Sequence, residues 1–134
     1  MRLIQKITIC AALMIAGLSA GAQEKGYDMF VPISKYISNG DSESLSAWFA
    51  DNLEISILSK ASIASKNQAK QILKTFFENY TPRSFTITHK AGRANMKYAI
   101  GNLNAGGETF RAIVFVSYRD QSYKIQQLIV ERIQ

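Results

Sequence analysis

The sequence predicts a small α+β domain in which N-terminal helices pack on a curved antiparallel sheet. Up to residue 80, the longest regular segment places its apolar residues at helical spacing, whereas from residue 84 onward apolar and polar residues alternate as in strands. Turn-forming residues separate the alternating segments. Helical segments followed by a run of strands are typical of the α+β class, in which helices cover one face of the sheet.

The first residues have the pattern of a cleaved signal peptide. Arg2 and Lys6 form a positive segment, residues 7–18 form an uninterrupted apolar run, and the small residues 20–22 fit a signal-peptidase site. The apolar run is too short for a bilayer span, which needs about 20 residues. We therefore expect residues 1–22 to be removed and the protein to be exported to the periplasm or the extracellular space.

The remaining chain, residues 23–134, has the size of a single domain with an adequate core. Cys10 is the single cysteine and lies within the signal peptide, so we expect neither a disulfide nor a thiolate metal site in the mature chain. Loss of Arg2 and Lys6 leaves fourteen basic against ten acidic residues, a net charge of +4. The basic residues stand singly, without the clustered patch of nucleic-acid-binding proteins, so no nucleic-acid partner is expected.

Two short helices are expected first. One spans about residues 29–38 with Asp28 as its N-cap, and Gly40 ends it because glycine readily adopts the left-handed conformation at a helix C-terminus. Asp41 or Ser42 can then cap a second helix. The inner face of this second helix carries Leu45, Trp48 and Phe49.

A strand is expected at residues 53–57, where apolar and polar residues alternate, and a short second strand at residues 59–64. The helix that follows is the most regular element of the sequence. Ser65 and Gln68 form a capping box at its start, and Pro82 limits its end because the residue before a proline is driven out of helical geometry. One continuous apolar stripe runs along it: Ala69, Ile72, Leu73, Phe76, Phe77 and Tyr80.

The remainder is expected to form four antiparallel strands, at residues 84–91, 96–103, 109–118 and 123–133. Alternation in the first of them places Phe85, Ile87 and His89 on one face, toward the space between sheet and helices.

The last two strands are apolar on both faces. In one strand, one face carries Phe110, Val114 and Val116 and the other face carries Ile113 and Phe115. In the last strand, one face carries Ile125 and Ile129 and the other face carries Leu128 and Val130. A sheet covered on one face alone does not need this pattern. Either both faces are covered within the chain, or the outer face meets a second subunit in a homodimer.

Six segments of the sequence carry a resemblance to known proteins: GDSESLSAWF, SKNQAKQILKTFF, SFTITHKAG, YAIGNL, FRAIVFV and YKIQQLIVE. They resemble a family of uncharacterised exported bacterial proteins, a domain of unknown function known chiefly from Bacteroidetes. The order helix, helix, strand, helix and then a bent antiparallel sheet resembles more widely the nuclear-transport-factor-two-like superfamily, a cone-shaped, cystatin-like fold. The resemblance covers nearly the whole mature chain, and it implies the fold rather than a chemistry because its motifs are packing and turn motifs.

The superfamily contains isomerases, dehydratases, polyketide cyclases, non-catalytic ligand binders and dimerisation modules, so the fold alone does not select a function. The resemblance implies that an enzyme of this kind would hold an Asp or His base and a Tyr or acidic proton donor inside the cone. The predicted strands of the sheet hold no Asp in an apolar context. An isomerase that combines an Asp base with a Tyr donor is therefore disfavoured.

The remaining catalytic candidates are His89 as a general base, with Tyr98 or Tyr80 as a hydroxyl donor in the cavity. The simpler interpretation is structural for all three, with a histidine at a strand end and tyrosines at the edge of the core. One histidine without a nearby carboxylate is not a catalytic signature.

A ligand in the cone would be lined by aromatic residues of the helix stripe and the neighbouring strands. Arg111 could bind an anionic group, or it could form a structural ion pair with Glu131. Trp48, together with Phe49, is better explained as a residue that fills the core than as an aromatic platform for a ligand. The candidate ligand-binding residues are Trp48, Phe76, Phe77, Tyr80, Phe85, His89, Tyr98 and Arg111.

The sequence leads to two competing functions. The leading hypothesis is a non-catalytic exported module that binds a small apolar ligand or an envelope protein, or associates with itself through the sheet. The alternative is a small isomerase-like or dehydratase-like enzyme that uses His89 with a tyrosine. One histidine and no cysteine in the mature chain are too few ligands for zinc, so no metal or cofactor is expected.

Overall fold

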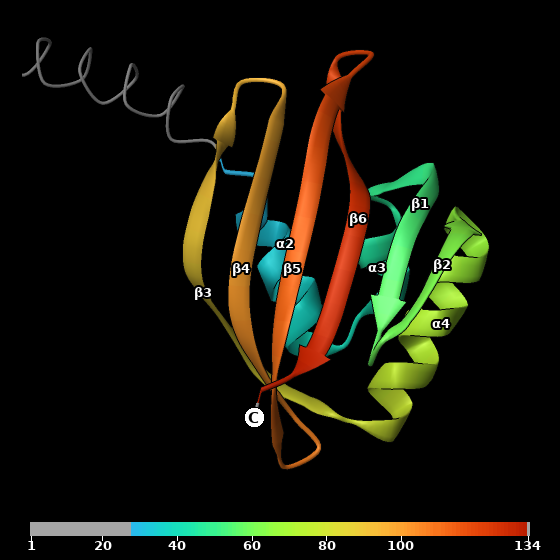
Figure 1. Ribbon diagram of the computed structural model, residues 1–134, viewed down its shortest axis with the longest axis vertical. Helices are drawn as coiled ribbons and strands as arrows, with labels where there is room; N and C mark the ends of the chain where they lie inside the picture. The colour runs from blue at the N-terminus through green and yellow to red at the C-terminus, as the bar shows by residue number, and fades with distance from the viewer. Residues whose placement is uncertain (1–27, 134) are drawn as a thin grey trace, which may run out of the picture.

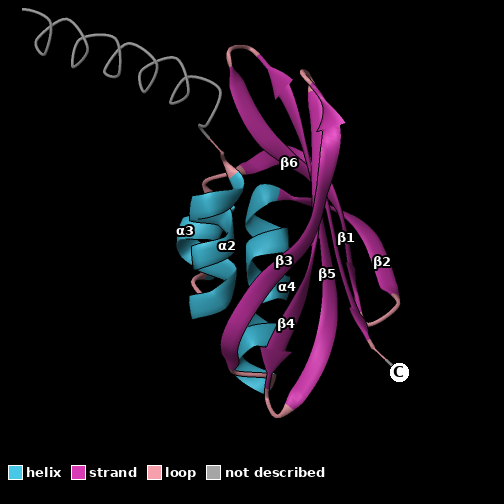
Figure 2. Ribbon diagram, turned by 90° about the vertical axis from the view of Figure 1, so that its left-hand side faces the viewer, coloured by secondary structure: helices cyan, strands magenta, loops and turns pink. Residues whose placement is uncertain are grey.

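The computed structural model describes residues 28–133, which form three helices on one face of a six-stranded sheet (Figures 1 and 2). The helices are α2 (Phe30–Asn39), α3 (Ser42–Ser46) and α4 (Lys66–Asn79). The strands are β1 (Phe49–Ile57), β2 (Lys60–Ser65), β3 (Pro82–Arg93), β4 (Met96–Ala105), β5 (Glu108–Arg119) and β6 (Ser122–Arg132). We call the helix-covered side of the sheet the inner face and the opposite side the outer face.

The α+β class predicted from the sequence is confirmed, and the sheet is curved and unclosed. The strands follow the order β2-β1-β6-β5-β4-β3, so β2 and β3 are its two edges. The sheet is mixed rather than wholly antiparallel, because β1 and β6 pair in parallel. Alternation indicates that a segment is a strand, but it does not indicate the direction of a neighbour that lies far away in sequence.

The predicted signal peptide, residues 1–22, lies outside the described residues. Within the described range, none of the helices has the length and apolar character needed to cross a membrane.

Capping residues start and end the helices largely where the sequence predicts. The capping box of α4 is present, with the Gln68 amide donating to Ser65 Oγ at 3.2 Å and the Ser65 amide donating to Gln68 Oε1 at 3.1 Å. Asp41 caps α3 by accepting a hydrogen bond from the Ser44 amide at 3.0 Å. Gly40, with φ of 67°, closes α2 in the left-handed conformation that glycine tolerates.

The second helix is shorter than predicted. It ends at Ser46, and Phe49 is the first residue of β1 instead of the last apolar position of the helix. Phe49 is nevertheless fully buried, because the chain turns from helix to strand directly beneath the core. Trp48 is partly buried and packs against the edge of that core, as the simpler sequence interpretation expected.

The core lies between the inner face of the sheet and the three helices. Leu45 of α3, Leu73 of α4, and Phe110 and Ile125 of the last two strands are at most 1% exposed. Phe110 packs edge-on against Phe76 of α4, with the ring centroids 5.2 Å apart. A single apolar cluster therefore joins all three helices to the sheet.

Two irregularities in strand pairing change which face several side chains occupy. In β3, the register shifts between Ile87 and His89, so Ile87 pairs with Gly101 while His89 pairs with Ile100. The extra residue reverses the alternation, because side chains alternate with a period of two. The prediction that His89 shares a face with Phe85 and Ile87 is therefore wrong.

The second shift lies opposite Phe115 and Val116, whose partners Gln127 and Ile125 are separated by the unpaired Gln126. As a result, Ile125 points inward with Leu128 and Val130, and Ile129 alone of the four points outward. The expected grouping of Ile125 with Ile129 on one face is wrong for the same reason as at His89. The prediction that the last two strands carry apolar residues on both faces is confirmed.

The capping role of Asp41 can be tested by stability. We expect Asp41→Ala to lower the free energy of unfolding by about 1 kcal/mol, because the Ser44 amide loses its hydrogen-bond acceptor. Urea unfolding followed by circular dichroism measures the change. Asp51→Ala is the control: Asp51 is exposed in β1 and makes no side-chain hydrogen bond within residues 28–133. An equal loss of stability in both variants would contradict the role of the cap.

A substitution at Gly101 in β4 can test how closely β3 packs against β4 at this position. A Cβ at this position would lie 2.6 Å from the ring of Phe85 and 2.7 Å from the backbone oxygen of Thr86. We expect Gly101→Ala to destabilise the protein by about 1–3 kcal/mol, as overpacking does. The adjacent exposed substitution Asn102→Ala should change stability by less than about 0.5 kcal/mol in the same thermal unfolding experiment. A neutral Gly101→Ala would show that the strands do not approach so closely.

Candidate functional site

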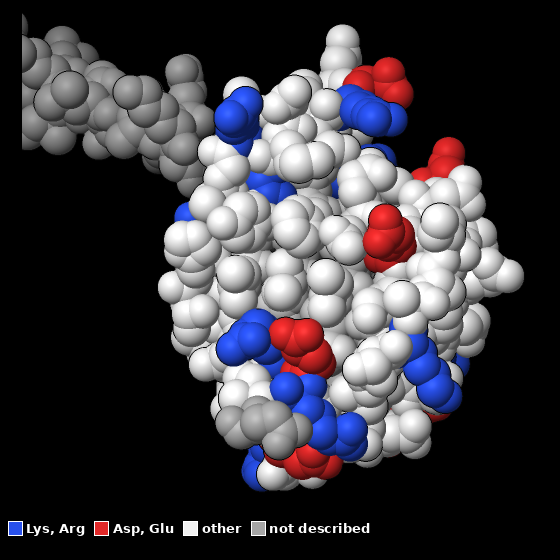
Figure 3. Space-filling model, in the orientation of Figure 1, with Lys and Arg blue, Asp and Glu red and all other residues white. Residues whose placement is uncertain are grey.

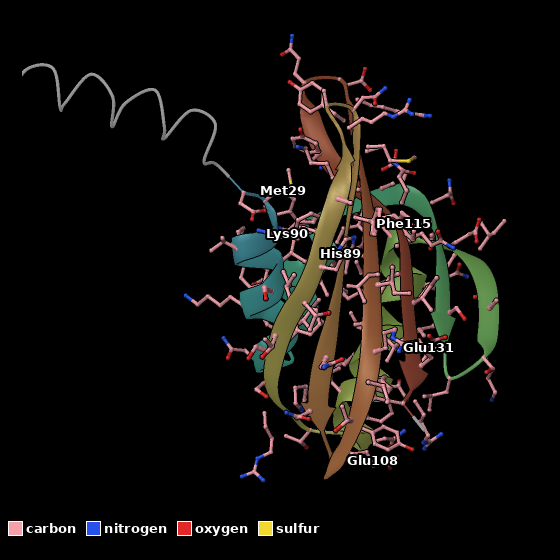
Figure 4. All side chains as sticks on the ribbon, turned by 60° about the vertical axis from the view of Figure 1, so that its left-hand side comes forward. Met29, His89, Lys90, Glu108, Phe115 and Glu131 are labelled. Carbon is pink, nitrogen blue, oxygen red and sulfur yellow. The ribbon has the colours of Figure 1, made fainter. Side chains whose placement is uncertain are left out.

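The histidine and tyrosine proposed as an acid–base pair lie together on the outer face. His89 Nε2 is 3.4 Å from the hydroxyl of Tyr98, and the Tyr98 ring centroid lies 5.4 Å from that of Phe115. Figure 4 shows that neighbouring residues leave β3 on opposite sides, with Lys90 toward α2 and His89 away from the helices. His89 and Tyr98 are thus close to each other, but they lie on the side of the sheet away from the space beneath the helices.

Tyr80, the other candidate donor, lies at the end of α4 on the inner side. Its ring packs against Phe76 and Phe110 at 5.2 and 5.1 Å. Its hydroxyl accepts a hydrogen bond of 2.7 Å from Arg132 Nη2, while Arg132 Nε donates to Glu108 at 2.9 Å. The bond to Glu108, with the nearby Tyr80 hydroxyl, raises the pKa of Arg132 above its ordinary value. The phenolic oxygen of Tyr80 is therefore engaged as a hydrogen-bond acceptor for Arg132.

A groove lies between the β1–β2 hairpin and α4, and we call it the hairpin groove. Its volume is about 490 Å³. The apolar walls are Ile57 and Leu58 from the hairpin with Ile72, Phe76 and the ring of Tyr80 from the end of α4 and the residue after it. The other lining residues are Lys60, Ala61, Ser62, Thr75 and Asn79. Of the eight predicted ligand-binding residues, Phe76 and Tyr80 line this groove.

The other predicted ligand-binding residues lie elsewhere. Phe77 is buried beneath Gly40, and Trp48 packs at the core edge. Phe85 packs over Gly101 and lines a shallow groove against α2. Arg111 is on the outer face and makes the predicted ion pair with Glu131, Nη1 to Oε1, at 3.2 Å. His89 and Tyr98 are on the outer face as described above.

Leu58 and Lys60 are among the groove residues that the sequence did not indicate as site residues. Leu58 and Ser59 form the tight β1–β2 turn with φ angles of 51° and 72°. Such a turn favours Asn-Gly, and a bulky residue in the left-handed region costs about 1–2 kcal/mol. The side chain of Leu58 faces the groove and also packs against the core. The available signal in the sequence was the lack of Gly, Pro, Asn or Asp between two alternating segments.

The β5–β6 turn has the same backbone conformation with different residues. Asp120 and Gln121 have φ angles of 51° and 66°. Asp tolerates the left-handed region better than Leu because its short polar side chain can bond to the nearby backbone.

Within residues 28–133, no three His, Cys, Asp or Glu side chains gather as a metal site would require.

Asp28 connects the start of α2 to β3. Its carboxylate accepts a hydrogen bond from the Phe30 amide at 2.8 Å and forms an ion pair with Lys90. Burial raises the pKa of Asp28, but the bonds from Lys90 and Phe30 and the positive charges of Lys90 and Lys97 outweigh it. The net effect is a pKa below the ordinary value of 3.8.

Comparison with known proteins places the chain in a fold family. The model of a family described as Domain of unknown function (DUF4783) matches residues 30–131. A DUF4783 family protein from Bacteroides uniformis shares 23% identity over 80% of this chain and 99% of its own, with a TM-score of 0.77. A protein of unknown function with an NTF2-like fold from Cytophaga hutchinsonii shares 10% identity over 79% of this chain and 88% of its own, with a TM-score of 0.59.

A third structure, a domain of unknown function with a cystatin-like fold from Nostoc punctiforme, shares 9% identity. It covers 76% of this chain and 71% of its own, with a TM-score of 0.61. No curated protein matches the chain. These similarities confirm the predicted resemblance in family and fold, and at such identities they carry no information on a site.

The ionic link at Asp28 predicts a pH dependence. Because its pKa is lower in the folded than in the unfolded chain, its ionised form stabilises the protein above about pH 5, and this stabilisation is lost as pH falls through the folded pKa. We expect Asp28→Asn to be less stable than the wild type at pH 7 and to converge with it in acid. Thermal unfolding across pH measures the difference. A constant difference at every pH would contradict this role for the charge.

Proposed function

We propose that this chain, which belongs to the DUF4783 family of domains of unknown function, is a non-catalytic interaction module that associates with a second copy of itself through the outer face of its sheet. The pattern of a signal peptide in residues 1–22 supports a role for this module in the periplasm or the extracellular space. The observation that carries the proposal is the composition of the outer face.

The outer face presents an apolar surface across the centre of the sheet. We define the outer-face patch as Met96, Tyr98, Ile100, Ile113, Phe115 and Ile129. Met96 is 52% exposed and the other five are partly exposed, although each stands in a regular strand where a polar residue would be tolerated. Figure 3 shows an uncharged area across the middle of this face, with one acidic side chain to the right of the centre and other charged side chains below it and at the margins. Apolar surface of this kind on a stable domain is typical of an interface.

The charge of the face favours a second copy as the partner. Arg111 and Glu131 neutralise each other at its margin, and Gln127 hydrogen-bonds Glu54 at 3.2 Å. The mature chain has a net charge of +4, so two copies repel each other weakly at long range. Two copies can meet through the outer-face patch, which itself carries no charge, with Glu54 and the Arg111–Glu131 pair beside it. A strongly charged partner would find no complement there.

The positions of His89, Tyr98 and Tyr80 do not support the enzymatic alternative. A base and a proton donor must converge on one cavity, close enough to share a substrate. His89 and Tyr98 are close to each other, but they belong to the open outer face. Tyr80 lies on the inner side, where its hydroxyl contacts Arg132. These positions support a binding role over an acid–base role.

Light scattering tests the self-association directly. We expect the mature wild-type protein to be a dimer at micromolar concentration and Phe115→Glu to be a monomer, because a carboxylate at the centre of the outer-face patch would be desolvated without a partner. A wild type that stays monomeric at the highest soluble concentration would overturn the proposal.

Val31→Glu is the matched control. Val31 is 67% exposed on α2, away from the sheet face, so this variant removes an exposed apolar side chain and adds the same charge elsewhere. We expect it to remain dimeric. Circular dichroism establishes that both variants are folded, so that a monomer reflects a lost contact. Dissociation of both variants alike would point to a general effect of charge and against the outer face.

A further inference from the structure

We infer that the hairpin groove binds an amphipathic carboxylate, an unbranched alkyl chain with an anionic end, and that Lys60 contacts the carboxylate. This site lies on the inner side of the sheet and is independent of the self-association proposed above. Three features of the groove carry the inference: its apolar walls, the sign of its charge and the backbone strain at its hairpin.

The walls fit an apolar chain. Ile57 and Leu58 of the hairpin face Ile72 and Phe76 of α4 across the groove, and all four side chains are apolar. A volume of about 490 Å³ is within the range of small-molecule sites, about 300–1,000 Å³. Phe76 is held in place by its contacts with Tyr80 and Phe110, so this wall is preformed.

The charge of the groove selects an anion. Lys60 is the one charged residue in the lining, and no acidic residue lines the groove. Lys60 pairs with Ile57 across the hairpin, so its side chain starts from the same face of the sheet as that apolar wall. Within residues 28–133, no carboxylate lies at ion-pair distance from its ammonium group. An anionic end on an apolar ligand would satisfy this ammonium group.

The strain at Leu58 indicates that its side chain serves the groove. A tight hairpin turn is most stable with Asn or Gly at this position, and a leucine there holds an unfavourable backbone conformation. The strained residue is also the one whose side chain forms a wall of the groove. Strained backbone of this kind is found at ligand sites, where the side chain that it positions is needed. The Asp120-Gln121 turn shares the conformation but lines no groove described above, and it provides an internal comparison.

The experiment titrates the mature protein with dodecanoate below its micellar concentration, using calorimetry and amide chemical shifts. We expect saturable binding, with the largest shifts at Leu58, Lys60 and Phe76. Dodecanol, which has the same chain without charge, should bind about fivefold more weakly, and dodecylammonium more weakly still. If dodecanoate does not saturate the protein, or if the shifts lie on the outer-face patch, the inference is wrong.

Substitutions in the protein then separate the contribution of the ligand's alkyl chain from that of its carboxylate. Leu58→Asn provides a residue suited to the turn and removes the apolar wall, so we expect the protein to remain folded while dodecanoate binding weakens about tenfold. Lys60→Gln should lower the affinity for dodecanoate to that for dodecanol and leave dodecanol binding unchanged. Lys60→Gln with an undiminished preference for the carboxylate would overturn the assignment of the head group.

The double variant Asp120→Asn with Gln121→Gly is the matched control for the turn. It relieves the same backbone conformation at the other end of the sheet, so it should stabilise the protein without changing dodecanoate binding. If it weakens binding as much as Leu58→Asn does, the effect comes from general changes in the hairpins, and the groove is not the site. Because these measurements follow ligand binding, a monomeric wild type would leave their outcome intact.

Discussion

The structure depends on the burial of one apolar cluster between the inner face of the sheet and three helices. Phe49, Phe110 and Ile125 lie fully buried at the centre of this cluster, and α2, α3 and α4 each contribute a side chain that covers them. The helices are too few to cover both faces of six strands (Figure 2). Within residues 28–133, the outer face is therefore left uncovered, although its strands remain apolar. That asymmetry is the physical origin of the self-association that we propose.

The parallel pairing of β1 with β6 shapes the rest of the molecule. It joins the β1–β2 hairpin to the four-strand meander and places the hairpin beside α4, which follows β2 directly in the chain. The hairpin is at the edge of the sheet, where β1 pairs with β6 as far as Ile57 and Val130, and the Leu58 amide donates to the Val130 oxygen at 2.9 Å. A groove opens between this hairpin and the end of α4. Its existence thus follows from the topology, and its chemistry follows from Leu58, Lys60 and Phe76.

The two bulges show how a single residue can redirect a functional hypothesis. Simple alternation puts His89 beside Ile87 under the helices, in the position of a catalytic base. One extra residue in β3 moves His89 to the outer face, where it contacts Tyr98. The same effect in β6 separates Ile129 from Ile125 and adds Ile129 to the outer-face patch. The bulge in β3 thus places an aromatic side chain on the exposed face, whereas the bulge in β6 lets Ile125 enter the core while Ile129 points outward.

Local interactions between neighbours in sequence determined the elements of this protein. The capping box of Ser65 and Gln68, the cap of Asp41 and the apolar stripe of α4 act within a few residues, so the sequence by itself predicts them. The predicted ion pair of Arg111 with Glu131 also follows from strands that are adjacent in the chain. The tertiary structure alone decided the direction of β6 beside β1, the faces of His89 and Ile129, and the position of Leu58 opposite Phe76. These features depend on pairing between distant strands and on where an extra residue is accommodated, and periodicity along the chain contains neither.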